Sequence, residues 1–475
     1  MGWLGLGLLG LALVLMLTTG WPSYAVLLGL TGAGALFGLA SGSVDLSLLA
    51  LLPARVIGLL EQDLLQAIAL YALVGALLAR MAIADDLRGG LARVADRLRP
   101  GHGGPLALLL LGALVSPLNG SVGASVLMLA RAAPAGGTQP AEQAAASALA
   151  GTLGVVVPPS LVLLLLGDTM LRAHTEGLNL ARDLALPLAS RPVRIVNTQD
   201  LLQAALLPGL LLLAGWLVIA AWRGGDAARP GRWTRRELAT LLVVPAFIVA
   251  LLVGVASGQV RAVEGAAAAA MLLLAWGAVS RQLDRRLLRA VLDDALALTG
   301  ALFALLVAAT SFSLLLRAFG TDRLVGAAML SLQGHPWQAV GAVLAALLGS
   351  AFVLDAFELI FLVVPIVMPP LLAQVADAAW VATLALLVLQ IGFLLPPAGY
   401  AVVLARAQFT PRPPLAPMVR LLVPFVGWAM LVVGVVAAFP QTTRWWRSAA
   451  PALEAPPANE QDVERLLREM SRPRE

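Results

Sequence analysis

A six-residue phrase that ends in two prolines occurs once in each half of the chain, and it constrains the fold more than any other feature. The copies are Gly154–Pro159 and Gly392–Pro397, and each interrupts a long apolar stretch. Adjacent prolines remove two backbone donors and stop a helix, so the freed carbonyls need partners in protein, water or an ion. Because the second copy follows the first by 238 residues (396 − 158), we predict an internally duplicated membrane protein whose broken segments meet near the middle of the bilayer.

The composition also indicates a membrane protein. The chain is 60% hydrophobic and 12% charged, whereas a soluble domain has about 25% charged residues. Windows that are apolar enough to lie in or across a bilayer are Leu106–Val115, Leu201–Trp222, Leu241–Val255, Leu344–Val353 and Val419–Phe439. Since a spanning helix needs roughly 20 residues, we predict an all-α polytopic membrane protein with about 11–13 membrane segments. The N-terminus lacks the features of a signal peptide and is expected to be the first membrane helix.

The positive charge lies in short loops. The formal net charge is +5 and comes from arginine, because the chain has no lysine. The arginines cluster in Arg88–Arg99, Arg223–Arg236 and Arg281–Arg289. The positive-inside rule puts these three loops on the cytoplasmic side of the membrane. They are therefore interpreted as topology signals and not as a nucleic-acid-binding surface.

Side chains that would support catalysis are few. Only three histidines are present, without the spacing of a zinc site. A P-loop is excluded because it requires lysine. The chain has no cysteine, which excludes disulfides and thiolate metal sites. We therefore expect neither an enzyme nor a bound cofactor, with a membrane-embedded enzyme or scaffold as a remote alternative.

A polar break precedes each Gly/Pro break at nearly the same separation. The first surrounds Asn119, which lies 39 residues before Pro158 (158 − 119), and the second surrounds Asp355, 41 residues before Pro396 (396 − 355). Hydroxyls, amides and unwound carbonyls are oxygen ligands suited to sodium, and exposed helix N-termini suit a carboxylate. The alternative is that these small residues only mediate close helix packing.

Asp355 and Glu358 are the acids of greatest interest, because an intramembrane carboxylate costs at least ~2.5 kcal/mol and usually faces a cavity or a partner. Their spacing puts both on one helix face. They are candidates for sodium coordination, proton carriage or a structural hydrogen bond, for which Gln390 is available. The residues predicted to bind substrate or ion are Asn119, Gly120, Ser121, Ser125, Thr152, Gly154, Pro158, Pro159, Asp355, Glu358, Gln390, Gly392, Pro396, Pro397 and Gly399.

At these positions the chain resembles the large membrane subunit, DctM-like, of tripartite ATP-independent periplasmic (TRAP) transporters. The similarity covers most of the sequence. The phrases that carry it are Gly20-Trp-Pro22, Gly120-Ser121, Ala144–Pro159, Arg261–Ala267, Leu354-Asp355, Val363–Pro369 and Leu395–Gly399. The segments that look closest to the branch linked to mannitol and chloroaromatic transport are Leu354–Glu358, Leu389–Phe393 and Gly167-Asp168.

The resemblance implies an elevator-type secondary transporter of the bacterial inner membrane, with two inverted repeats that each contain a helical hairpin and a broken helix. It implies sodium-driven import of an organic acid delivered by a periplasmic binding protein, with sodium as the coupling ion. A small four-helix membrane subunit completes such complexes, and because no such block precedes Met1 we expect it as a separate chain in the same bilayer. The sodium candidates are Asn119, Ser121, Thr152, Asp355 and Gly392.

The chain departs from the family pattern at two phrases. Asn119-Gly120-Ser121 replaces Ser-Gly-Ser, and Arg261 stands where the Thr-x-x-Glu-Ala-Ala phrase has threonine. The alternative is a stand-alone carboxylate or anion symporter of the wider superfamily, which needs no binding protein. Within a membrane domain of residues 1–439, the expected divisions are repeat one at about 62–222, repeat two at about 288–439, scaffold helices at 1–61 and 239–280, a polar extramembrane insertion at 171–200 and a tail at 440–475.

Overall fold

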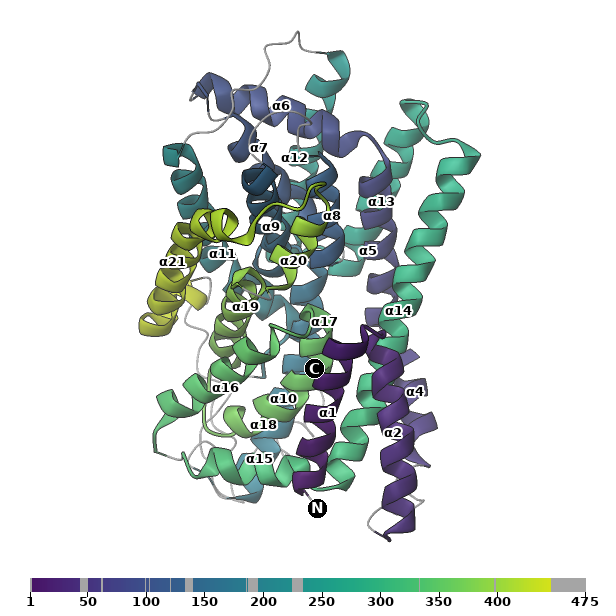
Figure 1. The fold of residues 1–475 in the computed structure, drawn as a ribbon, viewed down its shortest axis with the longest axis vertical. Coiled ribbons are helices and arrows are strands. Elements are labelled where there is room, and N and C mark those ends of the chain that lie inside the picture. The colour runs from purple at the N-terminus through teal and green to yellow at the C-terminus, as the bar shows by residue number, and fades with distance from the viewer. Residues whose placement is uncertain are drawn as a thin grey trace, which may run out of the picture.

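The computed structural model describes residues 2–42, 50–60, 63–98, 100–101, 103–119, 121–132, 140–184, 186, 195–223, 234–332, 334–396 and 399–445. All regular secondary structure in these ranges is helical (Figure 1). The predicted all-α polytopic fold is therefore confirmed.

The chain contains both full spans and shorter apolar helices. Among the described residues, eight helices are long and apolar enough to cross a membrane, or nine if the bent pair Gln66–Arg80 and Ile83–Arg97 forms one span. The shorter apolar helices are Gly103–Asn119, Val122–Ala132, Pro336–Ser350, Ala356–Leu372 and Ala378–Leu394. The shorter helices adjoin the predicted polar and Gly/Pro breaks, because the breaks divide what would otherwise be longer helices.

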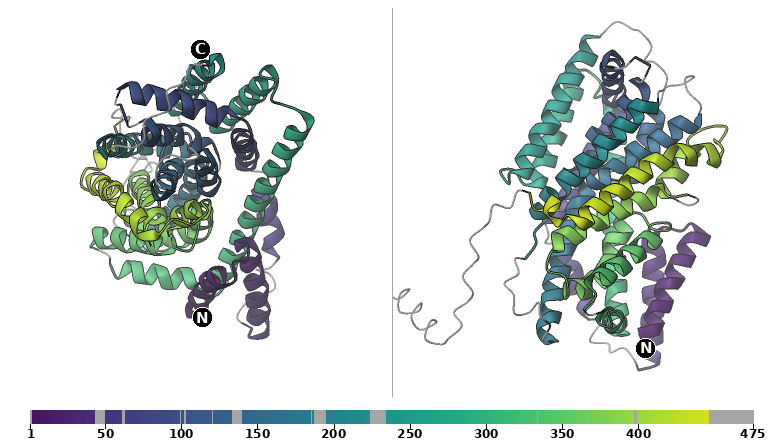
Figure 2. Two further views of the ribbon diagram at one scale, coloured as in Figure 1. Left: turned by 45° about the horizontal axis from the view of Figure 1, so that its top comes forward. Right: turned by 90° about the vertical axis from the view of Figure 1, so that its left-hand side faces the viewer.

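The helices form two groups, which the left view of Figure 2 separates into an elongated wall and a round bundle. The wall, named here the outer set, comprises α1 (Gly2–Thr19), α2 (Ser23–Ala40), α4 (Leu51–Leu60), α5 (Asp63–Arg80), α12 (Arg235–Ala256), α13 (Ala262–Val279) and α14 (Arg285–Ala318). Two helices lead from the outer set into the bundle, namely α6 (Ile83–Leu98) and α15 (Thr321–Leu330).

The bundle contains all the predicted breaks. From the first half it comprises α7 (Gly103–Val115), the 3₁₀ turn η1 (Ser116–Asn119), α8 (Val122–Ala132), α9 (Pro140–Val156), α10 (Leu161–Asp183) and α11 (Thr198–Arg223). From the second half it comprises α16 (Pro336–Ser350), α17 (Ala356–Glu358), the π-helical turn η3 (Leu359–Val363), α18 (Val364–Leu372), α19 (Ala378–Leu394), α20 (Tyr400–Ala407), α21 (Leu415–Ala438) and the 3₁₀ turn η4 (Pro440–Thr443).

The two halves present their elements in one order. The series α5, α6, hairpin α7–α8, α9, α10 and α11 corresponds to α14, α15, hairpin α16–α18, α19, α20 and α21. Contacts between the halves match this order, since α8 contacts α20 as α18 contacts α10. The matching helices α5 and α14 run antiparallel, because Arg80 at the end of α5 pairs with Asp294 near the start of α14 at 2.5 Å. Antiparallel matching helices are the arrangement that inverted repeats require, whereas the repeat boundaries stay predictions.

Ion pairs connect elements within and between the two groups. Arg93 on α6 pairs with Glu237 on α12 at 2.5 Å, and Glu237 also completes the capping box that begins α12. Arg317 on α14 pairs with Glu176 on α10 at 2.9 Å. This last pair joins the outer set to the bundle.

The polar stretch 171–200 is helical in its first part. Helix α10 continues to Asp183, and α11 begins at Thr198. Buried His174 anchors the connection, because its Nδ1 accepts a hydrogen bond from the Val196 amide at 3.2 Å. The placement of residues 171–200 outside the membrane stays a prediction. In the tail, Arg444 pairs with Asp377 at 2.5 Å, and residues 446–475 lie outside the described part of the chain.

Candidate functional site

The tip of the first hairpin is a 3₁₀ turn that side chains hold against α9. The Ser116 hydroxyl donates to the carbonyl of Ala150 at 3.0 Å, which ties η1 to α9. The Ser125 hydroxyl donates to the Ser121 carbonyl at 2.8 Å, and Asn119 Nδ2 donates to Ser125 Oγ at 3.4 Å. Predicted residues Asn119, Ser121 and Ser125 therefore lie together at the hairpin tip, where η1 leads into α8, while Gly120 lies outside the described residues.

Asn119 has a buried oxygen that the described residues do not satisfy. The side chain is 1% exposed, and no hydrogen-bond partner of its Oδ1 occurs in the described part of the chain. An unpaired buried acceptor costs about 1–3 kcal/mol. Such an atom is therefore suited to receive a cation or a water.

The first Gly/Pro break lies directly behind this tip. Helix α9 ends at Val156, and Ser160 caps α10 by accepting a hydrogen bond from the Val162 amide at 3.1 Å. The Ser160 hydroxyl also donates to the Gly154 carbonyl at 2.5 Å. The Pro158-Pro159 bond is cis, and both prolines are buried. The predicted break is therefore present, and one serine satisfies groups on both sides of it.

Gly154 is required by close packing. A Cβ added to it would lie 2.6 Å from the carbonyl oxygen of Ser116. A small cavity, too narrow to hold a water molecule, lies between the two breaks and is lined by Ser116, Pro117, Ser121, Val122, Gly154, Ser160, Leu161 and Val162. Residues of both segments thus line one space. Thr152 does not line this cavity; it is buried in α9, where its hydroxyl donates to the Leu149 carbonyl at 2.9 Å.

The tip of the second hairpin is closed by the two predicted acids. Asp355 Oδ1 accepts hydrogen bonds from the amides of Phe357 and Glu358, each at 2.9 Å. In return, Glu358 Oε2 accepts one from the Asp355 amide at 3.0 Å, which completes a capping box. Asp355 therefore precedes helix α17 instead of lying on its face with Glu358. The side chain of Glu358 also lies near Ser23 on α2.

The second Gly/Pro break repeats the packing of the first. Helix α19 ends at Leu394, and a Cβ added to Gly392 would lie 2.6 Å from Cβ of Ala351 at the end of α16. Gly399 donates its amide to the Leu395 carbonyl at 2.9 Å. Pro396 is half-buried, and Pro397 lies outside the described residues. In each half, a glycine of the broken helix lies against the hairpin of the same half.

Gln390 is another buried polar side chain with unsatisfied atoms. It is 1% exposed, and neither its Nε2 nor its Oε1 has a hydrogen-bond partner among the residues that the structure describes. The hydrogen bond to Asp355 that the sequence suggested is therefore not formed here. An amide with both ends unsatisfied is costly unless a bound species uses it.

The hairpins and broken helices of opposite halves also meet. A Cβ added to Gly123 on α8 would lie 2.7 Å from the hydroxyl oxygen of Tyr400, the first residue of α20. Both tips face the outer set. A Cβ added to Gly75 on α5 would lie 2.7 Å from the Asn119 carbonyl oxygen, and the second tip reaches α2 through Glu358. Among the predicted residues, Asn119 and Glu358 therefore lie at the boundary between the bundle and the outer set.

Three residues at this boundary were not predicted as site residues, namely Ser160, Tyr400 and Ser23. Ser160 follows a proline pair and precedes an apolar run, which is the signature of an N-cap, so the sequence carried a usable signal for it. Tyr400 and Ser23 act through contacts with segments more than a hundred residues away, which sequence spacing does not reveal.

Comparisons with known proteins agree on one family. The sequence profile described as tripartite ATP-independent periplasmic transporter, DctM component, matches residues 9–442. The chain is 25% identical over 405 residues to the C4-dicarboxylate TRAP transporter large permease protein DctM of Rhodobacter capsulatus, covering 82% of this chain and 87% of that protein. The assignment to the mannitol and chloroaromatic branch stays a prediction.

Two solved transporters share the fold. The YdaH transporter of Alcanivorax borkumensis superposes with a TM-score of 0.55 at 14% identity, covering 88% of this chain and 98% of that one. MtrF of Neisseria gonorrhoeae gives a TM-score of 0.52 at 12% identity, covering 82% and 83%. With the profile match over nearly the whole chain, the protein belongs to the DctM family of TRAP transporter large permeases and is a multi-pass protein of the inner membrane.

Proposed function

We propose that this chain is the permease through which a TRAP transporter imports an organic acid, delivered by a periplasmic binding protein and driven by a sodium gradient. The observation that supports this is the contact of both hairpins with the broken helices beside the outer set, since η1 and α17 both contact α10 and α8 contacts α20. Broken helices with exposed termini and unwound carbonyls are the usual form of substrate and ion sites in secondary transporters. The relative from R. capsulatus is named a C4-dicarboxylate permease, which favours a carboxylate.

Helix N-termini supply the positive potential for such an anion. Helices α10 and α20 begin directly after the two Gly/Pro breaks, at Leu161 and Tyr400. The first turn of each helix has N–H groups without intrahelical partners and the positive end of the helix dipole. The predicted site residues include no arginine, so backbone groups carry the recognition of the carboxylate.

Sodium binds in this proposal at the oxygens around the first break. Ser116, Ser121, Gly154 and Ser160 line the small shared cavity and offer hydroxyl and carbonyl oxygens there. Asn119 Oδ1 is a further buried oxygen without a partner in the described ranges. In the second half, Asp355 uses Oδ1 for its cap, so Oδ2 is the candidate ligand. Thr152 and Gly392 stay sodium candidates by resemblance.

The transport step is an elevator motion. The bundle holds the breaks as one packed unit, and it moves relative to the outer set with the substrate and sodium bound. The partners are the binding protein and a small four-helix membrane subunit, a separate chain.

Uptake into proteoliposomes tests the proposal. The chain and its small subunit are reconstituted and offered a panel of labelled organic acids, with the binding protein and the sodium gradient each present or absent. We expect uptake only with both. Uptake without the binding protein would favour the stand-alone symporter. Equal uptake with and without the sodium gradient would contradict sodium coupling.

Two variants of Asp355 separate its cap from its charge. Asn is as good an N-cap as Asp, whereas Ala removes the cap at about 0.5–2 kcal/mol. We expect both Asp355→Asn and Asp355→Ala to reach the membrane and to lose uptake, and only Asp355→Ala to lower the melting temperature. Wild-type uptake by Asp355→Asn would exclude the carboxylate as an ion ligand.

A further inference from the structure

A second cavity, of about 420 Å³, lies on another part of the boundary between the outer set and the bundle. Its lining comes from α5, α10, α11, the end of α12, the connection 257–261 and the start of α13. Most of the lining is apolar, including Leu164, Leu202 and Val263. The volume falls within the range of roughly 300–1,000 Å³ typical of small-molecule pockets. None of the residues predicted to bind substrate or ion lines it.

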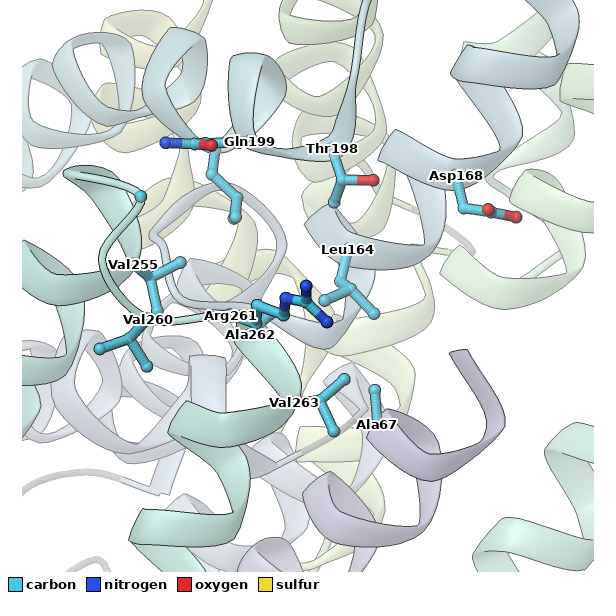
Figure 3. A pocket seen from close by; sticks show the side chains of 12 residues that line it. Ala67, Leu164, Asp168, Thr198, Gln199, Val255, Val260, Arg261, Ala262 and Val263 are labelled. Carbon is cyan, nitrogen blue, oxygen red and sulfur yellow. The ribbon is translucent and has the colours of Figure 1, made fainter. Parts of the chain in front are cut away.

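Arg261 is an exposed residue that adds a positive charge to the lining of this cavity. Figure 3 shows its guanidinium pointing into the space between Leu164 and Val263, whereas the carboxylate of Asp168 points away from it. In the described ranges no carboxylate lies within ion-pair distance of Arg261. The nearby carboxylates accept hydrogen bonds from other donors. Asp168 accepts from Arg172 at 3.0 Å, Glu264 from the Arg261 amide at 2.9 Å, and Asp200 from the Asn197 amide at 3.0 Å.

Two helix N-termini reinforce this charge. Thr198 and Gln199 begin α11, Ala262 and Val263 begin α13, and all four line the cavity. The positive ends of both helix dipoles therefore converge on the space that the guanidinium occupies.

We propose that this cavity binds an amphipathic anion. One carboxylate or phosphate pairs with the guanidinium of Arg261, and an apolar body of several carbon atoms contacts Leu164, Leu202 and Val263. A phospholipid and a free amphipathic acid both have this chemistry. Because the lining comes from the outer set and the bundle, either ligand touches both groups of helices.

Binding to the purified full-length protein tests the proposal, with one arm for each source. In the first arm, delipidated protein in detergent is titrated with hexanoate by calorimetry. In the second arm, the protein is released from nanodiscs, and native mass spectrometry counts the phosphatidylglycerol molecules that stay bound to it. The variants are Arg261→Gln, Arg261→Lys and the matched control Arg323→Gln, which changes an exposed arginine of α15 outside the cavity.

We expect Arg261→Gln to weaken binding of one of the two probes at least about tenfold, because hydrogen bonds to charged groups contribute about 1.5–3 kcal/mol. Arg261→Lys should keep most of the binding, and Arg323→Gln should match the natural chain. Loss of hexanoate binding identifies a free acid, and loss of phosphatidylglycerol retention identifies a lipid. Binding of neither probe, or binding that Arg261→Gln leaves unchanged, would overturn the proposal.

Discussion

Gln390 combines complete burial with an amide that no described residue satisfies, which is a costly arrangement in a helix interior. Replacing the amide by an apolar side chain of similar size removes that cost. We therefore expect Gln390→Leu to raise the stability of the protein by about 1–3 kcal/mol, measured as a higher melting temperature in detergent. We expect the same variant to lose uptake, because the amide is retained for a species bound during transport.

Thr383 on the same helix provides the control for this prediction. It is also fully buried, but its hydroxyl donates to the Ala379 carbonyl at 2.8 Å. Thr383→Val should therefore leave both uptake and the melting temperature close to those of the natural chain. Normal uptake by Gln390→Leu would remove the amide from the transport cycle.

At the scale of elements, the close approach of α9 to the tip of the first hairpin depends on Gly154. An added Cβ would lie 2.6 Å from a backbone oxygen, which cannot move aside as a flexible side chain can. We expect Gly154→Ala to cost about 1–3 kcal/mol by overpacking and to lower the melting temperature and uptake together. The distortion would fall on the small cavity that Ser121 and Ser160 also line.

Gly341 on α16 is the matched control, because a Cβ there would meet nothing within 4 Å. Gly341→Ala should be neutral or stabilising by up to about 1 kcal/mol, since alanine favours the helix. If Gly154→Ala and Gly341→Ala have the same melting temperature, close packing does not explain the glycine at position 154.

The breaks themselves were predictable at this scale, because proline and glycine act on the local backbone. Helix α9 ends at Val156 and α19 at Leu394, within the predicted phrases. The capping role of Asp355 and Glu358 was not predicted. Their three-residue spacing fits a helix face and a capping box equally well, and only the structure shows that the helix begins after Asp355.

At the scale of the whole molecule, the elevator proposal requires the bundle to move past the outer set. The pair Arg317 and Glu176 joins the two groups at 2.9 Å. Because the chain has no cysteine, cysteines at these two positions can be linked selectively by a reducible bifunctional thiol reagent. We expect uptake to stop when the two cysteines are cross-linked and to return when a reducing agent cleaves the cross-link.

Cysteines at Arg80 and Asp294 provide the control, because this 2.5 Å pair lies within the outer set and is about half exposed. Exposed pairs contribute little stability, so replacing it should be tolerated, and linking it should leave uptake unchanged. Continued uptake by protein linked between positions 176 and 317 would show that the two groups do not move apart there.

The sequence by itself determined the membrane class, the positions of the helix breaks, the family and most of the residues at the tips. These follow from composition and from local backbone chemistry, which need no knowledge of distant contacts. Only the tertiary structure decided which breaks meet, that Ser160 and Tyr400 belong to them, and that a charged cavity forms around Arg261. Those features depend on packing between segments far apart in the chain, and the same local sequence is compatible with many such packings.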